Sequence, residues 1–284
     1  MKYSFKILII MLILCNSPAF ADHSYFKSVK KKLKKDGFKK SYIEKIYKPQ
    51  NITFQFGGTS LFFKTSEYKL DYSKFLSDKF ISKGKEYIKK HKKTFDFTTK
   101  KYGVPPEIIT SILTIETRLG DYTGKIPVLA SLSSLSAMEK NHVKKMVKKS
   151  ILSRKNRYSS KKFKKRADSK SKWAYRELKK FIDYSRKFNL TPSEIKGSYA
   201  GAMGIPQFMP SNIIPYGADG NNDNKIDLQN HEDAIASVAN YLKKHGWEKN
   251  HKKNKDIKTI LTYNKSKPYA KTVLKLAKMI GEKR

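Results

Sequence analysis

The chain is short of cysteine, of acidic residues and of long apolar runs. It has one cysteine, and its 24 Asp and Glu stand against 62 Lys and Arg, which gives a formal net charge of +38 over 284 residues. A balance this basic excludes a halophilic protein. No apolar run approaches the roughly 20 residues that cross a bilayer, so we expect no transmembrane helix.

Glycine, proline and repeats are also scarce. The chain has 14 Gly and 10 Pro, and no segment recurs at a period of about 20 to 50 residues, which excludes collagen-like and solenoid proteins. The 17 Tyr and 16 Phe are scattered along the chain. They are enough for one sizeable hydrophobic core or two smaller ones.

The first 21 residues have the pattern of a secretory signal peptide. Two lysines precede an apolar run at 7–14, and Ala19 and Ala21 precede Asp22. Cleavage after Ala21 removes two lysines, so the mature charge is 38 − 2 = +36. It also removes Cys15, and with it disulfides and thiol chemistry. We expect an exported, periplasmic protein of the cell envelope; an outer-membrane lipoprotein is less favoured, because Leu14 rather than a small residue precedes the cysteine.

The high charge suggests a polyanionic partner, of which nucleic acid is the first to consider. Export argues against nucleic acid, and the lysines are spread through nearly every segment instead of forming one footprint. The densest stretch is Lys140 to Lys172. It is either a solvated surface or an electrostatic contact with anionic wall or membrane.

The hydrophobic pattern predicts mostly helices. Residues 24–46 indicate one amphipathic helix or two short ones, 52–63 is the best candidate for a strand or extended segment, and 70–101 indicates further helix. At 102–106 a glycine ends one helix and a proline opens the next. We therefore place the boundary between an N-terminal, mostly helical region (22–101) and a core (102–284) there.

The predicted helix 107–119 carries the most informative acid. Glu116 lies four residues after Ile112 and three before Leu119, offsets that put its carboxyl group on the apolar face. Desolvation there raises a carboxyl pKa and favours the protonated form that a general acid needs. Spacing alone leaves open a structural alternative, in which a buried Glu pairs with an arginine or caps a backbone.

Residues 196–211 form a segment rich in glycine and alanine that ends with Gln207 and Phe208. Small residues let a bulky ligand approach the backbone, and Gln and aromatic side chains suit the hydroxyls and faces of a sugar. Tight helix packing would explain the glycines but not the whole string. Near the C-terminus, Tyr263-Asn264 and Tyr269 add polar aromatic positions.

Four motifs in this order resemble the lytic murein transglycosylase B family. They are 115–120 (IETRLG), 197–210, 236–242 (ASVANYL) and Tyr263-Asn264. The resemblance covers essentially the whole mature chain. It implies a mainly α (α+β) fold with a lysozyme-like helical catalytic core, and non-hydrolytic cleavage of the MurNAc-β-1,4-GlcNAc bond of peptidoglycan to give 1,6-anhydroMurNAc ends.

The resemblance also implies a single-acid mechanism. Ordinary glycosidases use two carboxyl groups that flank the bond, whereas here Glu116 acts alone, first as acid and then as base, with the MurNAc acetamido group stabilising the cation. Four other nearby acids have simpler structural interpretations: Asp121, Glu177, Glu194, which completes a capping box with Thr191, and Asp233, in the first turn of a helix.

By position, the resemblance assigns further residues to the saccharide site. Ser198 matches the residue near the acetamido group, and Tyr263 matches one hydrogen-bonded near the catalytic Glu. The others match saccharide-binding or cleft-lining positions: Tyr199, Met203, Gln207, Phe208, Tyr241, Asn264 and Tyr269. No cofactor is implied for catalysis.

Residues 219–230 have the ligand spacing of an EF-hand-like calcium loop. The ligand positions are Asp219, Asn221, Asp223, the carbonyl of Lys225, Asp227 and Asn230. Asn224 replaces the turn glycine, and asparagine tolerates the left-handed backbone conformation. Asn230 replaces the bidentate glutamate, which lowers the negative charge of the site. Family members carry a similar loop. A structural Ca²⁺ and an Asn/Asp-rich turn that caps the helix 231–245 both remain open.

Three other function classes compete. A non-catalytic wall-binding protein would share the cleft, a lysozyme-like hydrolase would release reducing-end products, and a nucleic-acid-binding protein lacks a recognisable motif. We expect a monomer that acts on peptidoglycan glycan strands and binds no nucleic acid. Cell-wall synthesis or secretion-system proteins are conceivable partners that the sequence does not identify.

Overall fold

A computed structural model describes residues 23–64, 70–152, 160–248 and 253–282. The expected signal peptide at 1–21, with Cys15, lies outside them. The described chain is mainly helical, as predicted. The α-helices are α1 (Lys27–Lys35), α2 (Lys40–Ile46), α3 (Phe56–Lys64), α4 (Asp78–Lys90), α5 (Lys92–Tyr102), α6 (Pro106–Thr117), α7 (Val128–Ala137), α8 (Asn141–Leu152), α9 (Ser160–Lys187), α10 (Pro210–Tyr216), α11 (His231–Lys244), α12 (Lys253–Tyr263) and α13 (Lys267–Gly281).

Short elements complete the fold. The 3₁₀ helices in the described part of the chain are η1 (His23–Phe26), η2 (Pro49–Asn51) and η4 (Ser73–Leu76). Two strands, β1 (Ile126–Pro127) and β2 (Lys196–Gly197), pair antiparallel, with Ile126 opposite Gly197. No helix in the described ranges is both long enough and apolar enough to span a membrane.

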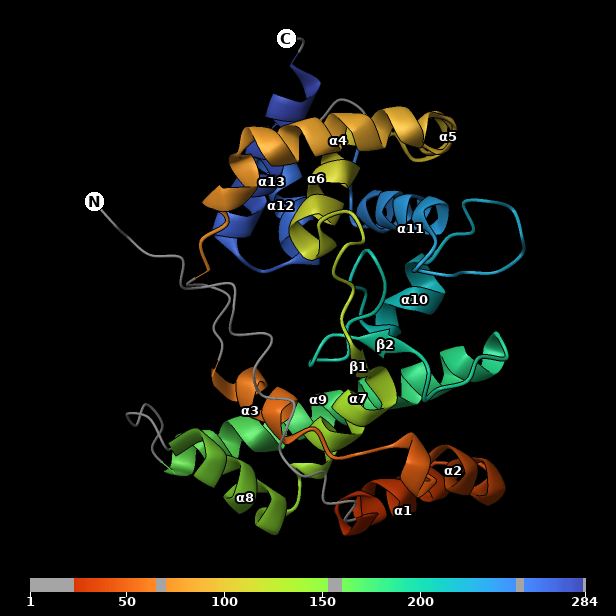
Figure 1. The fold of residues 1–284 in the computed structure, drawn as a ribbon, viewed down its shortest axis with the longest axis vertical. Coiled ribbons are helices and arrows are strands. Elements are labelled where there is room, and N and C mark those ends of the chain that lie inside the picture. Colours follow the sequence, from red (N-terminus) through yellow and green to blue (C-terminus); the bar gives the residue numbers. More distant parts are fainter. Residues whose placement is uncertain (1–22, 65–69, 153–159, 249–252, 283–284) are drawn as a thin grey trace.

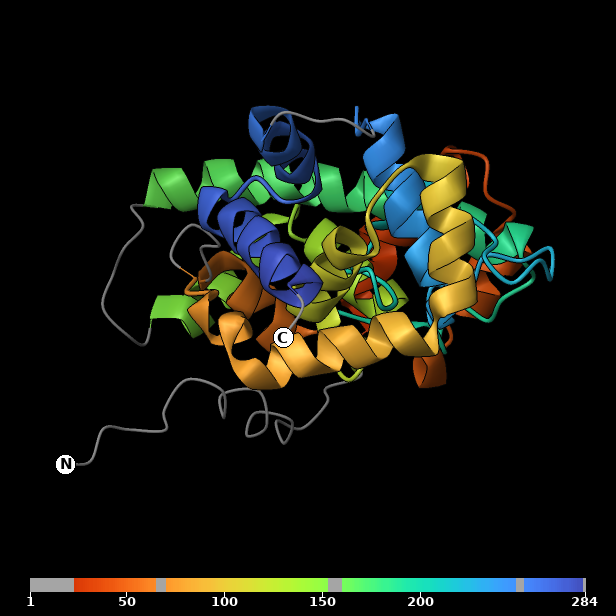
Figure 2. The ribbon, with the colours of Figure 1, turned by 90° about the horizontal axis from the view of Figure 1, so that it is seen from above.

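The helices form two groups (Figure 1). In the first, called the α6 group, α6 packs against α13 and α4, and α5 lies beside α11, with α12 next to α13 (Figure 2). In the second, the α9 group, α7 lies along α9, α3 packs on α8 and α7, and α1 with α2 packs near α7. The sheet and α10 lie between the groups.

The region before residue 102 contributes to both groups. The predicted pair of short helices in 24–46 is confirmed by α1 and α2, which belong to the α9 group, whereas α4 and α5 belong to the α6 group. The predicted break at 102–106 is confirmed: Gly103 takes a φ of 72° after α5, and Pro106 opens α6. The division of the chain into two regions at 101/102 stays a prediction.

The strand expected at 52–63 is wrong for most of its length. Ile52 is extended, but helix α3 begins at Phe56. The aromatic and threonine residues suited a strand, but the structure offers no partner strand there, and Thr59 and Phe63, four residues apart, are buried on one helical face. Phe63 packs on Phe163 of α9, with ring centroids 5.3 Å apart.

The lysine-rich stretch 140–172 lies on α8 and the first half of α9. Residues 153–159 fall outside the described part. On α9 the apolar Phe163 and Ala167 are buried, while Lys161, Lys162 and Lys165 are exposed. Its contact with an anionic surface stays a prediction.

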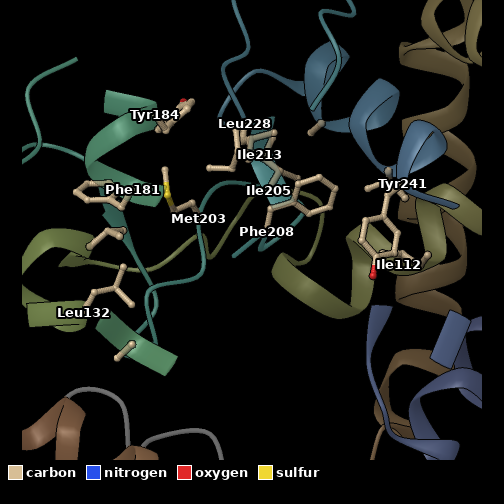
Figure 3. Close-up of a cluster of buried hydrophobic side chains, with 14 of the residues drawn as sticks. Ile112, Leu132, Phe181, Tyr184, Met203, Ile205, Phe208, Ile213, Leu228 and Tyr241 are labelled. Atoms are coloured by element: carbon tan, nitrogen blue, oxygen red, sulfur yellow. The ribbon is translucent and has the colours of Figure 1, made fainter. Parts of the chain in front are cut away.

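Segment 197–208 joins the two groups through its buried side chains. Figure 3 shows Met203 beside Phe181 of α9, and Phe208 on the side of Tyr241 of α11. The segment folds back on itself, because the backbone N–H of Met203 donates to Phe208 O (2.8 Å) and that of Phe208 donates to Met203 O (3.1 Å). A substitution that moves this segment therefore disturbs the packing of both groups.

Gly204 provides a test of this role. Its φ is +69°, and a Cβ there would lie 2.4 Å from the carbonyl oxygen of Leu228. We expect Gly204→Ala to lower the free energy of unfolding in urea by more than about 3 kcal/mol, from backbone strain plus overpacking. Gly37→Ala is the matched control, since Gly37 also has a positive φ (+92°) but nothing within 4 Å. Equal losses in both variants would mean that close packing at Gly204 contributes nothing.

Candidate active site

Glu116 lies in the last turn of α6 and is half-buried. The hydroxyl of Tyr269, on α13, donates a hydrogen bond to its Oε1 over 2.7 Å. Tyr269 is only 1% exposed and packs edge-on against Tyr72, 5.6 Å away. The carboxyl group is thus oriented by a donor that cannot move away without opening the α6–α13 contact.

Tyr263, at the end of α12, lies near the same carboxyl group. Its hydroxyl donates to the carbonyl oxygen of Pro206. Burial, and next the charge of Glu116, raise the pKa of both Tyr263 and Tyr269 well above the usual value. Both phenols therefore remain protonated donors at any physiological pH. The family position of Tyr263, hydrogen-bonded near the catalytic Glu, stays a prediction, and the hydroxyl that donates to Glu116 Oε1 is that of Tyr269.

The turn after Glu116 is bound to segment 197–208 through Thr117. The Thr117 hydroxyl donates to Ile205 O (2.8 Å) and accepts from the backbone N–H of Gly120 (3.1 Å). Thr117 is 1% exposed. Sequence reasoning overlooked this residue, because its partner lies 88 residues away along the chain.

Ser198 and Tyr199 lie at the start of the glycine-rich segment, half-buried. The Ser198 Oγ accepts hydrogen bonds from the backbone N–H groups of Ala202 (3.0 Å) and Ala200 (3.3 Å), so its own proton can be donated outward. Tyr199 packs against α3, where a Cβ on Gly58 would lie 3.2 Å from the Tyr199 Cβ. Both remain predicted saccharide contacts.

Gln207 is half-buried with a φ of +51°. Its Nε2 donates to Gly204 O (2.8 Å) and Thr123 O (3.1 Å), which leaves the side-chain carbonyl oxygen for a ligand. Met203 and Phe208 are 3% and 2% exposed and belong to the core that joins the helix groups. In this structure their direct role is packing.

Tyr241 also faces the core. Its ring lies 5.6 Å from Phe208 and 5.0 Å from Tyr263, and its hydroxyl donates to Thr262 O (2.8 Å). Asn264 follows Tyr263 and is half-buried, and its Oδ1 is shielded from solvent with no hydrogen-bond partner among the described residues. An unsatisfied amide acceptor suits a ligand hydroxyl or N–H.

The other acids near the site have structural partners. Asp121 is ion-paired with Lys83 at 3.3 Å. Glu177 is buried and accepts from the N–H and hydroxyl of Ser211, both at 2.9 Å, at the start of α10. The capping box expected at Glu194 is wrong, because residues 191–194 form a turn with no helix after it.

The loop 219–230 is organised by side chains that accept from its own backbone. Asp219 accepts from the N–H groups of Asn224 (2.8 Å) and Asp223 (3.2 Å). Asn224 takes a φ of +65°, the left-handed conformation expected where calcium loops have glycine. Asp233 is fully buried and accepts from the N–H groups of Gly220 (2.8 Å) and Asp227 (2.7 Å), while burial raises its pKa.

Asn230 is the N-cap of α11, where its Oδ1 accepts from the N–H groups of Glu232 (2.7 Å) and Asp233 (3.3 Å). The helix-capping role left open by the sequence is therefore present. Within the described ranges, no cluster of three or more His, Cys, Asp or Glu side chains is arranged to hold a metal. The loop nevertheless has oxygen donors at alternate positions. They include amide and backbone carbonyl oxygens beside the carboxylates, and all three kinds are ligands that Ca²⁺ prefers.

Comparisons with known proteins find similar sequences. A family model described as Transglycosylase SLT domain matches residues 21–259. The Membrane-bound lytic murein transglycosylase B of Escherichia coli (strain K12) is 35% identical over 176 residues, which make up 62% of this chain and 41% of that protein. The chain thus spans about two fifths of the length of this relative.

Solved structures share the fold. The Escherichia coli lytic transglycosylase Slt35 in complex with calcium matches with a TM-score of 0.68 and 24% identity, over 93% of both chains. SltB3 of Pseudomonas aeruginosa in complex with NAG-anhNAM-pentapeptide matches with a TM-score of 0.71 and 18% identity, over 92% of this chain and 80% of that one. The expected lysozyme-like helical fold is confirmed.

The hydrogen bonds of Thr117 can be tested by its two closest replacements. Thr117→Val keeps the volume but leaves Ile205 O and the Gly120 N–H without this partner, and we expect a loss of about 2 kcal/mol or more in the free energy of unfolding. Thr117→Ser keeps the hydroxyl and should retain most of the stability. The measurement is urea unfolding followed by circular dichroism; a valine variant as stable as the serine variant would contradict the assignment.

Proposed function

The chain belongs to the transglycosylase SLT domain family, since the family model covers 259 − 20 = 239 of its 284 residues, and from this we propose that it is a peptidoglycan lytic transglycosylase. It cleaves the MurNAc-β-1,4-GlcNAc bond without water and leaves 1,6-anhydroMurNAc ends. The observation that carries the proposal is Glu116, held by Tyr269 at the end of α6 beside the glycine-rich segment.

Glu116 performs both proton transfers. As the neutral acid it donates its proton to the glycosidic oxygen while the C1–O bond breaks, and the MurNAc acetamido oxygen bonds to C1. The carboxylate then takes the proton of the C6 hydroxyl, and O6 replaces the acetamido oxygen at C1.

A single-acid mechanism is supported by how the neighbouring acids are used. Asp121 is ion-paired with Lys83, and Glu177 binds the first turn of α10. Each of these acids therefore already has a partner within the protein. The Tyr269 hydroxyl, in turn, stabilises the Glu116 carboxylate that forms after the first step, by a charge-assisted hydrogen bond.

Location follows from the same proposal. Peptidoglycan lies outside the cytoplasmic membrane, and the signal-like residues 1–21 would take the protein there. We place the enzyme in the periplasm, where it acts on glycan strands.

The first test is mass spectrometry of the soluble products released from purified peptidoglycan. Wild-type protein should release anhydromuropeptides, and Glu116→Gln should lower the rate by about a thousandfold or more, because the amide can neither donate nor accept the proton. Asp121→Asn is the matched control, an acid five residues away with an exposed ion pair, and should keep most activity.

The products also separate the competing functions. Reducing-end MurNAc products would make the protein a lysozyme-like hydrolase. Binding to peptidoglycan with no release from the wild type would make it a wall-binding module without catalysis.

We further propose that loop 219–230 binds a structural Ca²⁺. The ligands would be Asp219, Asn221, Asp223, the Lys225 carbonyl, Asp227 and Asn230, and the cation would fix the loop before α11 without entering the reaction. Support comes from the oxygen-rich donor set and from Asn224 in the left-handed conformation.

Calcium binding is tested by thermal unfolding with and without the ion. At a free Ca²⁺ concentration about 100 times Kd, the stability should rise by about 2.7 kcal/mol. The double variant Asp219→Asn with Asp223→Asn should lose this gain, whereas Asp183→Asn on α9 should keep it. If Ca²⁺ leaves the stability of the wild type unchanged, or raises the stability of all three proteins equally, the loop acts only as the cap of α11.

A further inference from the structure

We propose that Arg118 and Tyr122 form a subsite that binds a carboxylate of the stem peptide on the glycan strand. The inference rests on the proposed function and assigns a substrate feature to the turn that follows Glu116. Arg118 lies two residues after the catalytic acid, at the C-cap of α6. Nothing in the acid–base chemistry of Glu116 requires an arginine there.

The backbone of this turn is strained. Arg118, Leu119 and Gly120 take consecutive positive φ values of 54°, 63° and 101°. For the two residues that carry side chains, this conformation costs about 1–2 kcal/mol each. It is maintained by hydrogen bonds from the Arg118 N–H to Thr114 O (2.9 Å) and from the Leu119 N–H to Leu113 O (3.1 Å). Such strain is concentrated at functional sites, because it fixes a side chain in one direction.

The Arg118 side chain is fixed by Tyr122. Its guanidinium carbon lies 4.5 Å from the centre of the Tyr122 ring. Tyr122 is 60% exposed, so the pair lies at the surface. The cation–π contact covers one side of the guanidinium group, and its N–H groups remain for a ligand.

No protein carboxylate binds these N–H groups. Among the described residues, the Arg118 guanidinium has no ion pair and no hydrogen-bond acceptor, and the nearest acid in sequence, Asp121, is paired with Lys83 instead. An unpaired cation at a helix C-terminus has a simpler use, which is to balance the helix dipole. A lysine would serve that purpose, and this chain has 55 Lys but only 7 Arg.

The chemistry of the pair selects the ligand. A planar guanidinium with parallel N–H groups binds a carboxylate through two hydrogen bonds. The sugar hydroxyls and acetamido groups of a glycan strand are neutral, whereas its stem peptides carry free carboxylates next to an aliphatic chain that can lie on the Tyr122 ring. A lactyl carboxylate on a MurNAc without peptide is the other source of this group.

The test compares strands that carry stem peptides with strands from which an amidase has removed them. We expect Arg118→Asn to lower the ratio of kcat/KM for peptide-bearing over stripped strands by about 10- to 100-fold, the size of a charge-assisted contact. Asparagine is chosen because it tolerates the left-handed conformation, so the fold should persist. Arg118→Lys and Tyr122→Leu should each lower the ratio by less, and Arg176→Asn, an exposed arginine on α9, should leave it unchanged.

A binding measurement separates this inference from the proposed function. In the Glu116→Gln background, calorimetry gives Kd for GlcNAc–MurNAc with and without a peptide, and Arg118→Asn should weaken only the peptide-bearing ligand. Amidation of the peptide carboxyl groups should have the same effect as the Arg118 variant. A loss confined to the peptide-free ligand would assign Arg118 to the lactyl carboxylate, an equal loss for both ligands would assign it to the saccharide or to the fold, and no loss would make it a structural cap; each of these results overturns the subsite. If the wild type releases no product but the peptide-dependent difference in Kd is present, the proposed reaction fails and the subsite stands.

Discussion

The geometry of the candidate active site depends on the contact between the end of α6 and segment 197–208. The Thr117 hydroxyl bonds to Ile205 O in this segment, and Tyr263 bonds to Pro206 O from the other side. Glu116 lies between these two attachments, and Tyr269 fixes its oxygen. Since the same segment packs against α9 through Met203, the carboxyl group is placed relative to both groups of helices at once.

The sequence was most informative where the signal was local. Gly103 and Pro106 define the start of α6, and the isoleucine pattern places Glu116 on it, because helix ends and faces depend on neighbouring residues. Motif order led to the family, whose model matches most of the chain. The Asn224 conformation was also predictable, since asparagine accepts a positive φ.

The rest depended on contacts between distant residues. The helix at Phe56–Lys64 forms because α8 and α9 provide a surface for Phe63, although the local composition favours a strand. The hydrogen bond of Tyr269 to Glu116 and that of Tyr263 to Pro206 O are set by where α13 and α12 pack. Buried positions such as Phe208 and Tyr241 match saccharide positions of the family, but burial depends on the whole fold, and the sequence alone does not separate an aromatic at a sugar from one in the core.

The alternation of the chain between the two helix groups determines the order in which the protein can be completed during synthesis. The α9 group is built from 23–64, 128–152 and 160–187, and the α6 group from 78–117, 231–248 and 253–281. Neither group is continuous in sequence; the α9 group is complete once α9 has been made, whereas the α6 group needs α13. Helix α6 emerges early, but Tyr269 belongs to α13, 153 residues later. The acid of the site therefore acquires its hydrogen-bond donor only after α13 has been synthesised, and until then the nascent chain has no assembled catalytic centre.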